Sequence, residues 1–442
     1  MLFLRECKKA VFSVAYLILI AGMILMIWSQ DAFDFRDRIL EMPRPGQESY
    51  GTQLKEIPEL IMPAALLSLY GEFMENRYTA YPIGFIKVVR LNDSKQKEIA
   101  GILEALSGEP AETLLKAAGE MEGNEGGRTV INGGELVPDG NGGFTIEVPG
   151  RGANNGDDPQ GPISLKPDIT YDLFKTYMDK ADKLIGGGSS YDPADLKRFS
   201  RVPLTYEEAL ASYNLIVEKD GVTGAYARLF TDYLCLTLSV LPVILASAIS
   251  LKDRKSGIKG ILYTRQASSL RIVLTRYAAI VTVVMIPAIL LAYVSNTSVW
   301  SAYKGITLDY LAPFKYTMGW ILPSVMVSSA LGLFLTELTN TPVAIAVQGF
   351  WWFVDMNLGV SEIEGGYSLF RLTPRHNSLQ NTLVFIEGFG NLAANRLFFT
   401  GVALLLTAGT VIVYEKKRRG GLNGFAGKIR SNSSYRRSQS AA

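Results

Sequence analysis

Six apolar runs separated by polar segments divide the chain. They cover residues 10–28, 229–250, 272–294, 317–336, 342–359 and 398–414. Each is close to the roughly 20 residues that a helix needs to cross a bilayer. The pattern predicts a polytopic α-helical membrane protein with six transmembrane helices.

The first apolar run follows Arg5, Lys8 and Lys9, an arrangement that also begins a secretory signal peptide. The run is longer than the roughly 7–15-residue apolar core of a signal peptide, and no small-x-small cleavage site follows Trp28. We therefore expect it to remain uncleaved, with residues 1–29 forming a cytoplasmic N-terminus and the first transmembrane helix.

A long polar insertion, residues 30–226, separates the first two runs. Its amphipathic stretches and turn residues predict an α/β, mainly helical domain. Helices are expected at 53–77, 94–106, 168–185 and 205–219, and a strand is expected at 85–91. Thr205 and Glu208 have the spacing of a capping box. Residues 119–163, rich in glycine, predict either a mobile segment or one hairpin around Asn141-Gly-Gly.

Basic residues beside the apolar runs predict the orientation of the chain. They cluster in the N-terminal segment, in the loop 252–271 and in the tail 416–442. An even number of spans places these three segments on one side. We therefore expect a multi-pass plasma-membrane protein with both termini in the cytoplasm and the insertion outside. The remainder of the transmembrane domain is then 227–415, and its amphipathic loop 360–397 is expected at the outer leaflet.

Composition limits the kinds of catalytic and metal sites that the chain can form. The chain has 442 residues, of which 48% are hydrophobic, and a formal net charge of +2. Cys7 and Cys235 lie in or beside apolar runs, so no disulfide framework is expected, and a single histidine, His376, argues against a His-rich metal site. The sequence lacks Gly-x-x-x-x-Gly-Lys-Ser/Thr. We therefore expect no ATP hydrolysis, no catalytic residue, and no cofactor or metal bound by this chain.

Arg228, Asp232 and Asp355 are the candidate polar residues of the membrane interior. Such residues are costly in a bilayer and usually face protein or water. Arg228 and Asp232 are one helical turn apart and can pair with each other. For Asp355 two interpretations remain open. It either lines a substrate path or pairs with a base such as Arg228, or it lies at the outer headgroup level beneath an aromatic belt.

The loop 252–271 is short, basic and punctuated by glycine. A short helix here would gather its aliphatic side chains on one face, and its glycines would let another backbone approach. The residues expected to contact a partner are Asp253, Gly257, Ile258, Ile261, Leu262 and Arg265. Ser268 or Ser269 can cap the next span. The alternative is a solvated loop that only sets the topology.

This loop resembles the cytoplasmic coupling loop of permeases of the type-2 ATP-binding-cassette (ABC) exporter family. That loop carries an acid, a glycine four residues on, a leucine-rich turn, a Thr-(Arg/Thr)-Pro step and a lysine at the start of the third span. The matching positions are Asp253, Gly257, Leu262, Thr264, Arg265 and Arg276. Gln266 stands where proline is usual, and Arg276 stands where lysine is usual.

The resemblance implies a permease subunit that forms the translocation path, as a homodimer or heterodimer, and is driven by a separate ATPase subunit. It implies ATP bound only by that partner, no nucleic-acid partner, re-entrant helices within 360–397, and an origin in a Gram-positive-like bacterium. An alternative is a membrane-anchored sensor or scaffold whose extracellular domain binds a peptide or envelope ligand. A second alternative, an ion-coupled transporter, would need ionisable residues near mid-span and an internal repeat.

Overall fold

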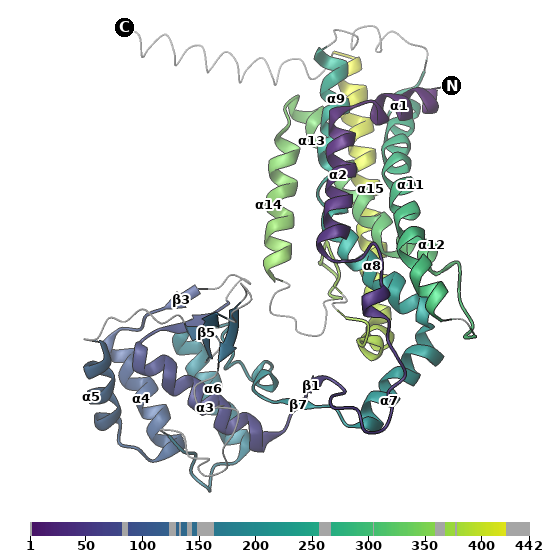
Figure 1. Ribbon diagram of the computed structural model, residues 1–442. Helices are drawn as coiled ribbons and strands as arrows, with labels where there is room; N and C mark the ends of the chain where they lie inside the picture. The colour runs from purple at the N-terminus through teal and green to yellow at the C-terminus, as the bar shows by residue number, and fades with distance from the viewer. Residues whose placement is uncertain are drawn as a thin grey trace, which may run out of the picture. The chain divides into compact units, whose positions relative to one another are not determined.

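The chain divides into two compact units in the computed structural model (Figure 1). We call Met1–Met42 together with Leu210–Ala442 the membrane unit, and Pro43–Ala209 the inserted unit. The structure describes residues 2–81, 87–122, 130–131, 134–138, 144–147, 163–255, 267–303, 305–358, 367–375 and 378–420.

The membrane unit is built from helices. They are α1 (Leu2–Val11), α2 (Val14–Ser29), η1 (Arg36–Arg38), η3 (Ile216–Asp220), α8 (Val222–Leu238), α9 (Pro242–Lys255), α11 (Ser269–Ala302), α12 (Ala312–Tyr316), η4 (Thr317–Ile321), α13 (Leu322–Thr339), α14 (Val343–Leu358) and α15 (Thr382–Arg418).

Four helical stretches of this unit are long and apolar enough to cross a membrane. They are Val222–Lys252, Ser269–Ala302, Ala312–Thr339 and Thr382–Arg418. The pair α1 and α2, bent by 65°, makes a fifth if it is counted as one span. Helix α14 has 16 residues and is therefore about 24 Å long, against the ~30 Å of a hydrocarbon core. The chain is a helical membrane protein by this measure, and a sixth span through α14 stays a prediction.

The bend between α1 and α2 has a local cause. The Ser13 hydroxyl donates a hydrogen bond to the Ala10 carbonyl over 2.6 Å and accepts one from the Tyr16 N–H over 3.2 Å. One serine thus ends the first helix and caps the second. The apolar run predicted as one helix over 10–28 therefore begins as the end of α1 and continues, after the bend, as α2.

Helix α13 lies inside the membrane unit, where it packs against α9, α11, α14 and α15. Gly332 makes the closest of these approaches possible. A Cβ at this position would lie 2.7 Å from the Ala246 Cβ and 3.1 Å from the Val243 carbonyl oxygen. Small residues allow such backbone contact between helices in a membrane, where packing rather than water drives association.

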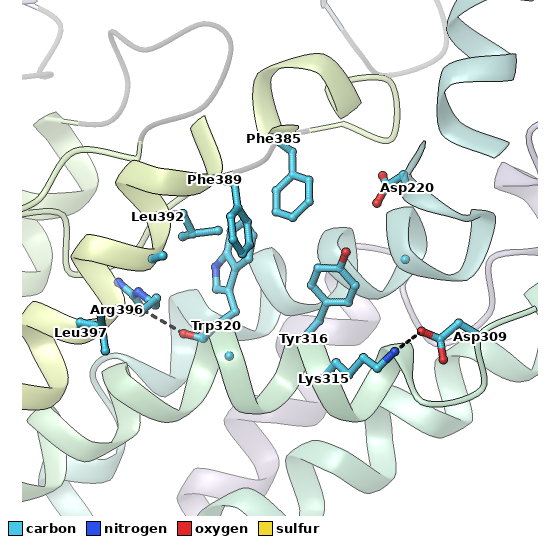
Figure 2. A pocket seen from close by; sticks show the side chains of 13 residues that line it. Asp220, Asp309, Lys315, Tyr316, Trp320, Phe385, Phe389, Leu392, Arg396 and Leu397 are labelled. Carbon is cyan, nitrogen blue, oxygen red and sulfur yellow. Dashed lines mark hydrogen bonds and ion pairs between the residues drawn. The ribbon is translucent and has the colours of Figure 1, made fainter. Parts of the chain in front are cut away.

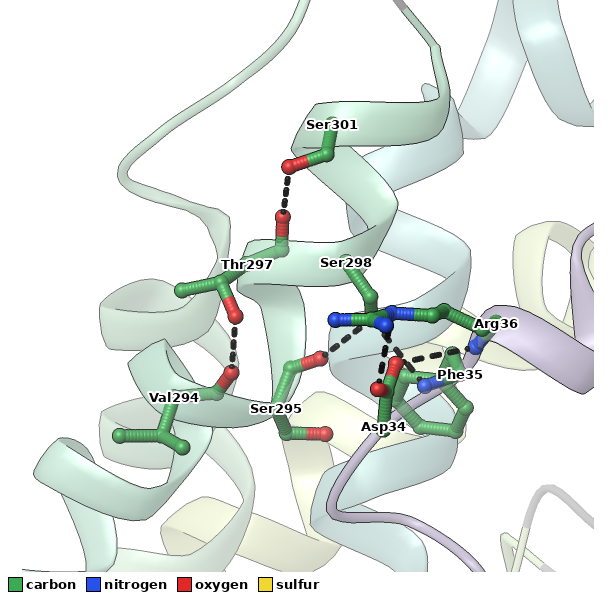
Figure 3. A network of polar contacts seen from close by, with 8 residues as sticks. All are labelled: Asp34, Phe35, Arg36, Val294, Ser295, Thr297, Ser298 and Ser301. Atoms are coloured by element: carbon green, nitrogen blue, oxygen red, sulfur yellow. Dashed lines mark hydrogen bonds and ion pairs between the residues drawn. The ribbon is translucent and has the colours of Figure 1, made fainter.

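The segment after α2 is bound to the far ends of α8 and α11. The Phe35 N–H donates to the Ser298 hydroxyl over 3.1 Å (Figure 3). The Tyr226 hydroxyl donates to the Arg38 carbonyl over 2.7 Å, and the Tyr303 hydroxyl donates to the Leu40 carbonyl over 2.7 Å. Residues 30–42 and 210–226, which sequence patterns assign to the insertion, thus belong to the membrane unit.

Helix α15 begins at Thr382, well before the predicted start of the last span at residue 398. Its 37 residues correspond to about 55 Å of helix, which exceeds the thickness of a hydrocarbon core. The last helix thus begins earlier than predicted, and the re-entrant-type arrangement of 360–397 at the membrane stays a prediction. Residues 382–397 continue the last helix, in which Gly388 and Gly390 are tolerated and no proline occurs.

The inserted unit combines helices with short antiparallel sheets. Its elements are β1 (Thr52–Leu54), α3 (Pro58–Glu75), β2 (Tyr78–Ala80), β3 (Lys87–Val89), α4 (Asp93–Ser107), α5 (Ala111–Glu122), β4 (Val130–Ile131), β5 (Gly134–Pro138), β6 (Phe144–Glu147), α6 (Tyr171–Ile185), η2 (Leu196–Phe199), β7 (Arg201–Pro203) and the start of α7 (Tyr206–Leu215). Strand β1 pairs with β7, β2 pairs with β3, and β4, β5 and β6 form a meander.

The predicted helices of this unit are confirmed as α3, α4, α6 and α7, each a few residues shorter or longer than expected. The capping box is confirmed as well. The Thr205 N–H donates to Glu208 over 3.1 Å, and the Glu208 N–H donates back to the Thr205 hydroxyl over 3.2 Å. Strands β5 and β6 pair antiparallel, and residues 139–143 between them, with the predicted Asn141-Gly-Gly turn, lie outside the described part of the chain.

Candidate functional site

One end of the membrane unit holds the two helices that flank the predicted coupling loop. Helix α9 ends at Lys255, and Ser268 caps α11 by accepting a hydrogen bond from the Arg271 N–H over 3.2 Å. Asp253 lies in the last turn of α9, and its side chain is outside the described residues. Gly257, Ile258, Ile261, Leu262 and Arg265 lie outside the described residues altogether. Their predicted contact with a partner stays a prediction.

The start of α11 is fastened to the end of α15. The Ser269 hydroxyl donates a hydrogen bond to the Glu415 carboxylate. The Arg418 guanidinium donates to the carbonyl of Ala267, the residue before the cap, over 2.9 Å. These two side-chain bonds link the exit of the predicted loop to a helix more than a hundred residues further along the chain.

The turn between α13 and α14 joins the same cluster. The Lys417 ammonium donates to the Glu337 carbonyl and to the Asn340 side chain, and it pairs with the Glu337 carboxylate at 3.6 Å. Asn340 ends α13 in the left-handed conformation, with φ of 58°. The ends of α11, α13 and α15 are therefore held together by side chains, and we call this set of contacts the helix-end clamp.

Helix α1 is connected to the clamp through an ion pair. The Arg276 guanidinium of α11 lies 3.3 Å from the Glu6 carboxylate of α1. Helix α1 buries Ala10 and exposes the large apolar side chains of Leu4 and Val11. An amphipathic helix with exposed apolar residues and basic residues is suited to lie in the interfacial plane of a membrane.

Arg228 lies at the opposite end of the span formed by α8 and α9, and it is fully buried. Its guanidinium pairs with the Asp220 carboxylate of η3 and lies 4.3 Å from the centre of the Phe385 ring. The Asp220 carboxylate also accepts a hydrogen bond from the Thr382 hydroxyl over 3.2 Å. Asp232, one turn after Arg228, is buried in α8. One carboxylate on Arg228 thus comes from Asp220, a residue that sequence reasoning did not single out, and the predicted pairing of Arg228 with Asp232 stays a prediction.

Asp355 is buried and binds backbone groups of the segment before α15. Its carboxylate accepts hydrogen bonds from the Leu372 N–H over 2.8 Å and the Thr373 N–H over 3.0 Å. Arg371 returns a hydrogen bond to the Asp355 carbonyl over 2.8 Å. Both interpretations of Asp355, at a substrate path or at the outer headgroup level, stay predictions. Its visible role is to anchor residues 371–373 to the end of α14.

Arg396 was missed by sequence reasoning because it lies just outside the predicted last span. It donates to the Trp320 carbonyl and the Ser324 hydroxyl, both over 2.9 Å, to the Asn395 side chain over 2.7 Å, and to the Leu372 carbonyl over 3.2 Å. The guanidinium therefore connects α15, α13 and the anchored segment. An Asn-Arg pair directly before an apolar run was the available signal.

A cavity of about 640 Å³ opens at this end of the membrane unit (Figure 2). Its walls come from η3, α8, α12, η4 and α15. The lining residues are Asp220, Gly224, Asp309, Lys315, Tyr316, Gly319, Trp320, Phe385, Phe389, Leu392, Ala393, Arg396 and Leu397. The cavity is mostly apolar, and its size suits a small ligand.

Fold and site thus define a helical membrane protein with a helix-end clamp at one end of its bundle and a cavity at the other. Compared with known proteins, the chain matches no protein-family model, no curated protein and no solved structure. Its function is therefore argued from its own residues.

Proposed function

We propose that this chain is the permease subunit of an ABC exporter of the type-2 family. It forms the translocation path in the plasma membrane as one half of a dimer and uses a separate ATPase subunit, which docks on the loop 252–271. The termini and the loop lie in the cytoplasm, and the inserted unit lies outside.

The helix-end clamp is the observation that carries the proposal. An energy-coupling loop has to move helices, not only itself, and the clamp ties the loop's exit to α15 through Ser269 and Arg418. Lys417 extends the connection to α13, and Arg276 extends it to α1. A displacement of the loop would therefore be shared by four helices instead of being absorbed by a flexible hinge.

The mechanism follows from this connection. Closure of the ATPase subunits around ATP pushes the loop, and the clamped helix ends move with it as a rigid group. The membrane unit then changes between two arrangements, whose relative populations the nucleotide sets through its differential affinity for them. Export direction rests on the family resemblance of the loop.

The sensor or scaffold alternative has less support. A sensor or scaffold does not need a side-chain network that joins the loop to the ends of α11, α13 and α15, whereas a transporter driven through the loop does. The ion-coupled alternative would use Asp355 as an ionisable group on a path, but this carboxylate is occupied by the N–H groups of Leu372 and Thr373.

The test is co-purification with the ATPase from solubilised membranes. We expect wild-type chain to retain an ABC ATPase, and Ile261→Asp with Leu262→Asp to lose it while the chain still inserts, because two carboxylates would be buried in an apolar contact. The matched control is Val88→Asp with Leu173→Asp, which places the same change on exposed aliphatic residues of the inserted unit. Retention of the ATPase by the loop variant, or the absence of any ATPase from the wild type, would contradict the proposal.

A further inference from the structure

The cavity at the end of the membrane unit is a groove between two helical faces. One wall is a single face of α15, where Phe389, Leu392 and Leu397 recur at helical spacing. The opposite wall is formed by α12 and η4, through Tyr316, Gly319 and Trp320. A Cβ at Gly319 would meet no atom within 4 Å, so the floor of the groove has unfilled space. Figure 2 shows the aromatic rings arranged around this space.

The apolar wall continues beyond the cavity along α15. Leu397 lies at its edge and is largely exposed, as are Leu404 and Leu405 two turns further on. In a span, such side chains face the lipid hydrocarbon. An alkyl chain could therefore lie along α15 from the bilayer into the groove without crossing a polar barrier.

The polar end of the groove offers an unused acceptor. The Asp220 side chain is fully buried, and its Oδ2 is engaged by Arg228 and Thr382. Its Oδ1 has no hydrogen-bond partner among the described residues. A buried carboxylate oxygen without a donor is unfavourable, so a group that donates a hydrogen bond is what this position lacks. The Tyr316 hydroxyl also interacts with the Asp220 carboxylate, so a bound donor would share this carboxylate with Tyr316 (Figure 2).

The two cationic side chains that line the groove have few hydrogen-bond donors left for an anionic ligand. The Arg396 nitrogens donate to oxygens of Asn395, Trp320, Ser324 and Leu372, so its N–H groups are occupied. The Lys315 ammonium lies 2.6 Å from the Asp309 carboxylate. An anionic head would meet the carboxylates of Asp220 and Asp309, while both cations that line the cavity, Lys315 and Arg396, are already engaged.

We propose that this groove binds an amphiphile whose alkyl chain lies along α15 and whose non-anionic head, an amine or a hydroxyl, donates a hydrogen bond to Asp220 Oδ1. The site goes beyond the proposed function, because binding requires only this chain. It is tested without an ATPase, so its failure would leave the coupling proposal standing.

The test uses the full chain in phosphatidylcholine nanodiscs, since that lipid head has no hydrogen-bond donor. Radiolabelled dodecylamine should bind saturably, above the background of empty nanodiscs. Dodecyl glucoside should displace it if a hydroxyl head suffices, and only amines should displace it if a cation is needed. Dodecyl sulfate should be a poor competitor. Binding that does not saturate, or equal competition by dodecyl sulfate, would overturn the proposal.

The variant Gly319→Leu tests whether the amphiphile binds in this groove. The added side chain should fill the groove and weaken binding about tenfold or more, since excluding even two methylenes from an apolar site has an effect of that order. The control is Gly349→Leu in α14, where a Cβ also meets nothing within 4 Å but which does not line the groove. Unchanged affinity in Gly319→Leu would place the bound amphiphile elsewhere and refute the assignment.

Discussion

A buried carboxyl group in the inserted unit should make the stability of that unit depend on pH. Glu72 lies in α3 and is 7% exposed. It accepts hydrogen bonds from the Thr79 N–H over 2.9 Å and from the Tyr191 hydroxyl over 2.6 Å. No basic side chain of the described residues forms an ion pair with it. Burial raises the pKa of Glu72 from 4.5 to about 7, and the two hydrogen bonds offset only part of this effect.

The size and sign of the effect follow from linkage. A folded-state pKa about 2.5 units above the unfolded value corresponds to about 3 kcal/mol. Because the folded state holds the proton more tightly, this stability is fully present below pH 4.5. This contribution to stability is lost as the pH rises through 7, and above that pH the stability no longer changes with this group. Tyr78 and Tyr191, which interact with Glu72, have pKa values raised by burial and stay protonated over this window.

The perturbation is Glu72→Gln, which removes the titration and keeps the shape of the side chain. Hydrogen exchange of α3 peptides in the full chain, corrected for intrinsic rates, should give wild-type protection that falls by about 3 kcal/mol between pH 4.5 and 7.5. Protection in Glu72→Gln should be nearly independent of pH. Glu59→Gln, which removes an exposed carboxylate from the same helix, should follow the wild type. If wild type and Glu72→Gln lose protection in parallel, the reasoning is refuted.

Two further predictions concern the membrane unit. Gly332→Leu should destabilise the membrane unit by roughly 3 kcal/mol or more and lower its thermal midpoint in detergent, because the new side chain would overlap Ala246 and the α9 backbone. The control is Gly401→Leu, at an open position of α15. Equal midpoints for the two variants would mean that α9 and α13 do not cross so closely. A tag inserted between 140 and 145 should react with an impermeant reagent added to intact cells, and protection there would reverse the proposed orientation.

Sequence patterns were sufficient for most local structure. The apolar runs located the membrane helices, because burial in hydrocarbon leaves a signal of composition that needs no knowledge of neighbours. The capping box at Thr205 and the cap at Ser268 were readable for the same reason, since each depends on residues within one turn. The attachment of residues 30–42 could not be read from sequence, because it depends on tyrosines far along the chain, Tyr226 and Tyr303.

Polar partners were decided by tertiary structure alone. Arg228 and Asp355 stood out in the sequence as costly charges, but their partners, the Asp220 carboxylate and the N–H groups of Leu372 and Thr373, depend on which helix ends meet. The helix-end clamp and the groove likewise join residues separated by dozens to hundreds of positions. Amino-acid order determined which segments enter the membrane, because hydropathy is a property of each segment. Packing determined which charges pair and where cavities remain, because both depend on distances between segments that are far apart in the sequence.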